Sequence, residues 1–87
     1  KNINADAYYL LTASMINQGK GAEAVPYAQT LAQLRPRSGH YLLGLCYLQA
    51  DKPELARAEL EKAYELDPGN SHAKELLDAL QKQLQSP

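Results

Sequence analysis

The sequence contains one pattern twice, at an offset of 32 residues that superimposes Pro36 on Pro68. Identical or similar residues align in the segments before both prolines. The aligned pairs are Ala24 with Ala56, Gln33 with Glu65, Leu34 with Leu66, Leu11 with Leu43 and Met15 with Tyr47. A fixed period of this size is typical of solenoid proteins, in which each unit keeps an apolar face exposed until a neighbour packs on it. We therefore expect stacked units that present a surface to partners.

Length and charge exclude several classes of partner. The 87 residues are 45% hydrophobic, which is enough for one small core. The formal net charge is −1, and no run of like charges is present. Such a chain does not suit nucleic acid or an anionic membrane surface. Its longest nearly apolar stretches, 7–16 and 41–48, are also shorter than the ~20 residues of a spanning helix, so we expect no membrane insertion.

Residues 1–87 are expected to form a single domain, which is either a mature chain or a piece of a longer protein, because no initiator Met or signal peptide is evident. Cys46 is the only cysteine, so an intrachain disulfide is impossible and the redox compartment stays open. A soluble protein of either the cytoplasm or the periplasm fits these residues.

Glycine and proline divide the chain into segments of helical length and period, with no alternating run that indicates a strand. We predict five helices, at 5–18, 21–34, 38–50, 53–66 and 71–84. Asp51 and Glu54 have the spacing of a capping box before the fourth helix, and Asn70 or Ser71 begins the fifth. The fifth helix has one apolar stripe and one polar face, which suits a helix that covers the end of a stack.

Both units can be aligned with the tetratricopeptide pattern W-x2-L-G-x2-Y, then A-x3-F, then P. In the second unit the seven positions are His40, Leu43, Gly44, Tyr47, Ala56, Leu60 and Pro68. In the first unit they are Tyr8, Leu11, Thr12, Met15, Ala24, Ala28 and Pro36, of which Thr12 and Ala28 depart from the preferred residues. The chain thus resembles the tetratricopeptide repeat (TPR) family over residues 5–84.

This resemblance implies an all-α, right-handed superhelical stack of two helix-turn-helix repeats and a C-terminal capping helix. The first repeat would span about 5–36, the second about 37–68 and the capping helix about 71–84. The family period is 34 residues, whereas Pro36 and Pro68 are 32 apart. We expect the difference to appear as a shortened first turn of the third helix or a tighter turn at 37–39. Gly44 should permit close approach of the partner helix near Ala56.

No residue pattern indicates an enzyme, a metal site or a cofactor. Residues 19–24 spell G-x-G-x-x-A, but a dinucleotide site needs a strand before this motif, and the preceding segment is helical. The two histidines, His40 and His72, lack a third ligand; we expect His40 to replace a core aromatic and His72 to be solvated. Cys46 has apolar neighbours, so we expect a buried, unreactive thiol.

The resemblance also implies a concave groove, lined by one side of the first and third helices. Its candidate peptide-binding residues are Tyr9, Ala13, Ile16, Asn17, Tyr41, Leu45, Leu48 and Gln49. Most are apolar or aromatic, as is common at interaction sites. Asn17 and Gln49 would offer amide hydrogen bonds to a ligand. Family members that bind acidic C-termini use a clamp of Lys, Asn and Arg, but the clamp positions here are Tyr9, Ala13, Leu42, His72 and Leu76.

The resemblance therefore favours a protein-interaction module, acting as scaffold, adaptor or assembly factor, that binds an apolar or amphipathic peptide segment. One alternative is a structural role, in which the same surface forms a homo-oligomer or docks on another domain of a longer chain. A second alternative is that the apolar residues only narrow a small groove. The exposed apolar residues near the N-terminus indicate that any further units lie on that side.

Overall fold

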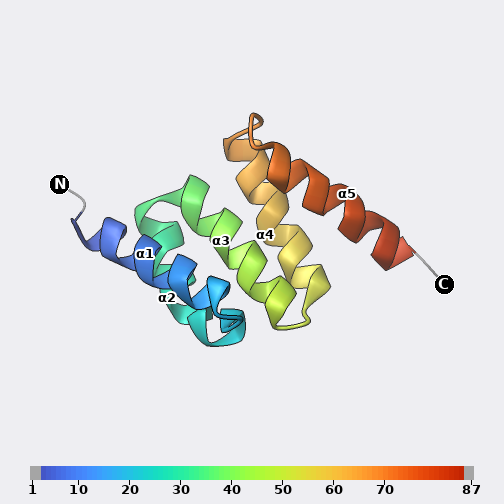
Figure 1. The fold of residues 1–87 in the computed structure, drawn as a ribbon. Helices are drawn as coiled ribbons and strands as arrows, with labels where there is room; N and C mark the ends of the chain where they lie inside the picture. The colour runs from blue at the N-terminus through green and yellow to red at the C-terminus, as the bar shows by residue number, and fades with distance from the viewer. Residues whose placement is uncertain (1–2, 86–87) are drawn as a thin grey trace.

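The computed structural model describes residues 3–85, and all regular structure in that range is helical. Five helices follow one another along an elongated molecule of 45 × 26 × 17 Å (Figure 1). They are α1 (Ile3–Asn17), α2 (Gly21–Leu34), α3 (Pro36–Gln49), α4 (Pro53–Leu66) and α5 (Ser71–Gln85). Each helix packs on the next, as in a helical-repeat solenoid. The prediction of an all-α stack of five helices is confirmed.

Helix α3 is the centre of the stack, because α2 packs on one side of it and α4 on the other. Two glycines permit these contacts. A Cβ added to Gly39 would overlap the backbone of Ala32 in α2, and a Cβ added to Gly44 would lie 2.7 Å from Cγ of Leu60 in α4. The predicted close approach at Gly44 is therefore present, with Leu60 as the nearest neighbour and the Ala56 carbonyl oxygen 3.5 Å away.

The core consists of three clusters that follow the stack. Ala24, Ala28, Leu43 and Cys46 form the first, Ala5, Leu31 and Leu42 the second, and Ala56, Leu60 and Leu80 the third. Thr12 is fully buried and occupies the position equivalent to Gly44, while Ala28 is equivalent to Leu60. At this pair of positions the larger residue is thus on α1 in the first repeat and on α4 in the second.

Helices α1 and α3 end in the same way, one period apart. After α1, the N–H of Gly19 donates to the Ile16 carbonyl and that of Lys20 to the Met15 carbonyl. After α3, Asp51 and Lys52 donate to Leu48 and Tyr47 in the same pattern, which is that of a Schellman motif. The left-handed residue of the motif is Gly19 (φ 78°) in the first case and Asp51 (φ 61°) in the second.

The expected capping box at Asp51 is therefore wrong. Asp51 belongs to the C-terminal motif of α3, and α4 begins after Lys52 without a side-chain cap. The expected start of α5 is confirmed, because the side-chain oxygen of Asn70 accepts a hydrogen bond of 3.1 Å from the backbone N–H of Ala73.

The connection between α2 and α3 explains the short period. It consists of Arg35 alone, and Pro36 is already the first residue of α3. The connection between α4 and α5 takes residues 67–70. The third helix is thus not shortened, and residues 37–39 are helical, so both expected locations of the shortening were wrong. The tight connection is also tied to α1, since the Arg35 guanidinium lies 2.6 Å from the Asp6 carboxylate.

Candidate functional site

The eight residues predicted to line a groove are divided equally between α1 and α3, and none of them is fully buried. Tyr9, Asn17 and Gln49 are exposed, while Ala13, Ile16, Tyr41, Leu45 and Leu48 are half-buried. The two helices are in direct contact. The predicted residues therefore retain surface that a second molecule can reach.

The structure brings two of these residues, Tyr9 and Tyr41, to one hollow of about 200 Å³. Arg37 and Ser38, at the start of α3, line the same hollow, as do Asp67 and Asn70 from the turn between α4 and α5. The hollow is thus assembled from three separate parts of the chain. A space of this size accepts one or two side chains of a bound peptide rather than a drug-sized molecule.

The phenol of Tyr41 is held in its neutral form in this environment. Burial against neighbouring helices raises the pKa of Tyr41, and the nearby phenol of Tyr9 raises it further. Within residues 3–85 no ion pair joins Arg37 to Asp67, although both line the hollow. The hollow therefore offers hydroxyl groups together with one cationic and one anionic side chain.

Arg37, Asp67 and Asn70 were not among the residues predicted to line the site. Arg37 directly follows the proline at which the repeat pattern ends, and Asp67 and Asn70 flank the other such proline. The segments around both prolines were predicted only to connect helices. No spacing rule indicates that these two connections meet the tyrosines of α1 and α3; only the packing of the helices shows it.

Most apolar groove residues also stabilise the fold. Ile16, Tyr41 and Leu45 pack against the cluster of Ala5, Leu31 and Leu42, and Leu48 packs against the cluster of Ala56, Leu60 and Leu80. Their inner edges belong to the core and their outer edges form the surface of α1 and α3. A substitution that tests binding must therefore spare Tyr41, which packs against both clusters.

The side chain of Gln49 forms hydrogen bonds within the fold that were not predicted from the sequence. Its side-chain oxygen accepts a hydrogen bond of 2.7 Å from the Gly21 N–H, and its side-chain nitrogen donates one of 2.8 Å to the Ile16 carbonyl. The expectation that the Gln49 amide is free for a ligand is therefore wrong. The Gln49 side chain links the turn between α1 and α2 to the end of α3 through hydrogen bonds. Asn17 has no such side-chain hydrogen bond among the described residues.

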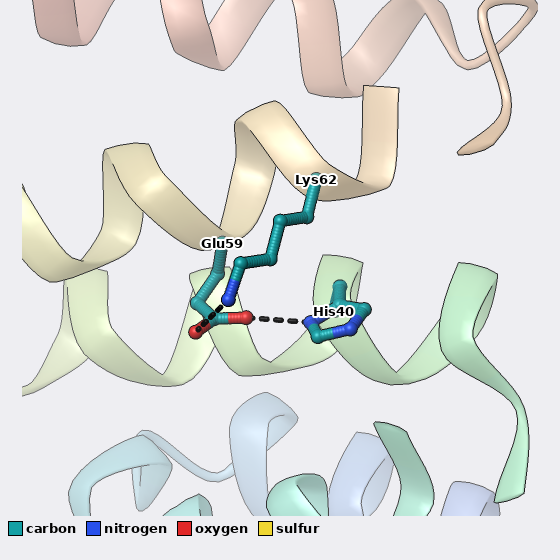
Figure 2. Close-up of polar contacts among 3 residues, drawn as sticks. All are labelled: His40, Glu59 and Lys62. Atoms are coloured by element: carbon teal, nitrogen blue, oxygen red, sulfur yellow. Dashed lines mark hydrogen bonds and ion pairs between the residues drawn. The ribbon is translucent and has the colours of Figure 1, made fainter. Parts of the chain in front are cut away.

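His40 joins α3 to α4 through a part-buried polar contact (Figure 2). Its Nδ1 lies 2.6 Å from Oε1 of Glu59, and both side chains are mostly buried. Lys62 Nζ lies 3.8 Å from the other oxygen of Glu59. His40 thus makes a part-buried polar contact and belongs to none of the three core clusters, unlike the core aromatic that was expected. His72 is exposed, as predicted.

The remaining candidates for chemistry have structural explanations. Cys46 has no exposed surface, which confirms the expected burial, and this burial raises the pKa of its thiol to about 11. The G-x-G-x-x-A segment follows helix α1, and its Gly19 is the left-handed residue of the helix end. Residues 3–85 contain no group of three potential metal ligands.

Comparison with known proteins supports the family on one of the two repeats. The tetratricopeptide repeat family model matches residues 37–70, which include α3 from its second residue, α4 and the turn before α5. A search of curated proteins found no match. No helix within residues 3–85 has the length and apolar character needed to cross a membrane. Members of this family generally act as protein-protein interaction modules and are typically non-catalytic. The match to residues 37–70, together with the paired helices, supports assignment of the chain to the tetratricopeptide repeat family.

Proposed function

We propose that this domain binds an apolar or amphipathic peptide segment of another protein along the surface of α1 and α3, as a scaffold, adaptor or assembly factor. The observation that supports this proposal is the hollow that Tyr9 and Tyr41 share at one end of a row of partly exposed apolar side chains. Apolar surface with adjacent tyrosine hydroxyls is typical of an interaction site, because the rings bury area while the hydroxyls bind polar groups.

The ligand would lie against the outer edges of Ala13, Ile16, Leu45 and Leu48, and would place a polar side chain in the hollow beside Tyr9. Asn17 would supply an amide hydrogen bond. Because two helices give a short groove, we expect the affinity of an isolated segment to be modest, with a Kd on the order of micromolar.

Site-specific photocrosslinking tests this proposal with a matched control. Tyr9 on α1 and Tyr27 on α2 have the same exposed fraction, 39%, but only Tyr9 lies in the proposed groove. A photoreactive phenylalanine at position 9 should crosslink a defined segment of a foreign protein in a lysate of the source organism, and the same residue at position 27 should not. Equal products from both positions would contradict the groove.

The same experiment distinguishes the alternative function. If position 9 crosslinks only to a second copy of this chain, the surface serves self-association. Sedimentation over a range of protein concentrations would then show a dimer, whereas the proposal predicts a monomer.

A further inference from the structure

Helix α1 has an outer face, defined by Ala7, Leu10 and Ser14, that differs from the proposed groove. These residues are spaced by three and four positions and so lie on one side of the helix. All three are exposed, and Leu10, with 67% of its surface accessible, is the most exposed large hydrophobic residue of the described chain. An exposed leucine on such a helix face often marks an interaction surface.

The internal repeat shows what this face does elsewhere in the molecule. An offset of 32 residues superimposes Ala7, Leu10 and Ser14 on Gly39, Leu42 and Cys46 of α3. All three α3 residues are buried, and the exposed fraction of Leu42 is 5%. Gly39 and Leu42 meet Ala32 and Leu31 of α2, and Cys46 packs with Ala24 and Ala28.

Helix α5 repeats the arrangement. With the 34-residue period of the matched repeat, the same three positions are Ala73, Leu76 and Leu80. Ala73 and Leu80 are buried, and Leu76 packs with Leu80 against Ala56 and Leu60 of α4. Ala73 also shows that alanine, the residue present in α1 as Ala7, is compatible with a covering helix at this position.

In both cases the covering helix is the one that directly precedes the covered helix in the chain: α2 precedes α3, and α4 precedes α5. A second folded copy cannot supply an equivalent surface, because its α2 and α4 are already covered by α3 and α5. We infer that the outer face of α1 is a docking surface for a further helix that precedes α1 in the polypeptide. That helix would carry a leucine and small residues at the spacing of Ala28, Leu31 and Ala32.

A chain extended by its own covering helix tests this inference. A second copy of residues 21–36, which contains α2 and its one-residue connection, is joined in front of residue 5. In the extended chain we expect a higher urea midpoint of unfolding, and we expect Leu10→Ala to lower that midpoint nearly as much as Leu42→Ala does. In the 87-residue chain Leu10→Ala should leave the midpoint nearly unchanged.

The matched control is the same extension with lysine in place of Ala28 and Leu31 in the added copy, which should abolish both effects. The inference is overturned if Leu10→Ala is equally silent in the extended and the 87-residue chains. It is also overturned if the 87-residue chain forms a dimer in sedimentation that Leu10→Lys abolishes, because a second copy would then cover the face. A dimer through this face is distinguished from self-association through the groove by Leu10→Lys, because Leu10 lies on a different side of α1 from Tyr9 and its substitution should leave photocrosslinking at position 9 unchanged.

Discussion

The side-chain oxygen of Gln49 accepts a hydrogen bond of 2.7 Å from the backbone N–H of Gly21, 28 residues earlier in the chain. With its second bond to the Ile16 carbonyl, this side chain joins the first helix of one repeat, the second helix of the same repeat and the first helix of the next. Gly21 is buried, and a Cβ there would lie 2.6 Å from this oxygen. The contact therefore depends on both residues.

Gln49→Ala should lower the free energy of unfolding by about 1–3 kcal/mol, because it removes two hydrogen bonds and leaves a part-buried N–H without its acceptor. The measurement is urea unfolding followed by circular dichroism. Gln33→Ala is the matched control, since Gln33 is an exposed helical glutamine outside this contact. An equal, small effect of both substitutions would show that the bridge contributes nothing.

Three glycine-to-alanine variants should differ in how far they lower the free energy of unfolding. Gly39→Ala should be the most destabilising, because its new Cβ would meet the backbone of α2, which cannot move without separating the helices. Gly44→Ala meets the buried side chain of Leu60 and should cost about 1–3 kcal/mol. Gly69→Ala, whose Cβ would have only an ordinary contact with Asp67, should be nearly neutral. Denaturant unfolding of all three checks the order, and a neutral Gly39→Ala would refute the proposed packing of α2 on α3.

Asp51→Gly should stabilise the protein by about 1 kcal/mol. Asp51 has φ 61°, a left-handed conformation that costs most L-residues about 1–2 kcal/mol and that glycine adopts freely, as Gly19 does one period earlier. Asp51→Ala keeps the conformational cost and should give no gain. Thermal unfolding of both variants measures the difference, and equal melting temperatures would contradict the assigned backbone conformation.

Cys46 should resist alkylation in the folded protein. Burial raises the pKa of its thiol from 9.0 to about 11, so at neutral pH the thiolate fraction is about 100-fold below that of an unfolded cysteine. Because the folded pKa is the higher one, the associated stability is fully present below the unfolded pKa and is lost as pH rises through about 11. Iodoacetamide labelling with and without urea measures the protection. Comparable rates in both conditions would contradict a buried thiol.

The helices and the second repeat were predictable from the sequence because their signals are local. Hydrophobic period, Pro53 at a first helical turn and Asn70 as a cap each act within a few residues. Residues 37–70 match the family pattern closely enough for it to be identified from the sequence. The role of Asp51 was misread, because an aspartate before a helix fits both a cap and a left-handed helix end. The location of the shortened period was also wrong, because it lies in the one-residue connection before Pro36.

The site was less predictable because it depends on contacts between distant segments. The sequence indicated that Tyr9 and Tyr41 share a face, but not that Arg37 and Asp67 border the same hollow. The hydrogen bonds of the Gln49 side chain to residues 28 and 33 positions earlier could not be predicted from the sequence either. A helical period assigns a side chain to a face of its own helix; which other segment reaches that face follows only from the packing.

The central claim, that the surface of α1 and α3 binds a peptide, is tested most directly by calorimetric titration with the synthetic segment that photocrosslinking at position 9 identifies. Ala13→Arg places a long cationic side chain on the proposed groove, and Ala58→Arg makes the same change at an exposed position of α4. We predict binding with a Kd on the order of micromolar to the unmodified protein and to Ala58→Arg, and affinity reduced about tenfold or more by Ala13→Arg with an unchanged unfolding midpoint. Equal affinity for all three proteins would contradict the groove.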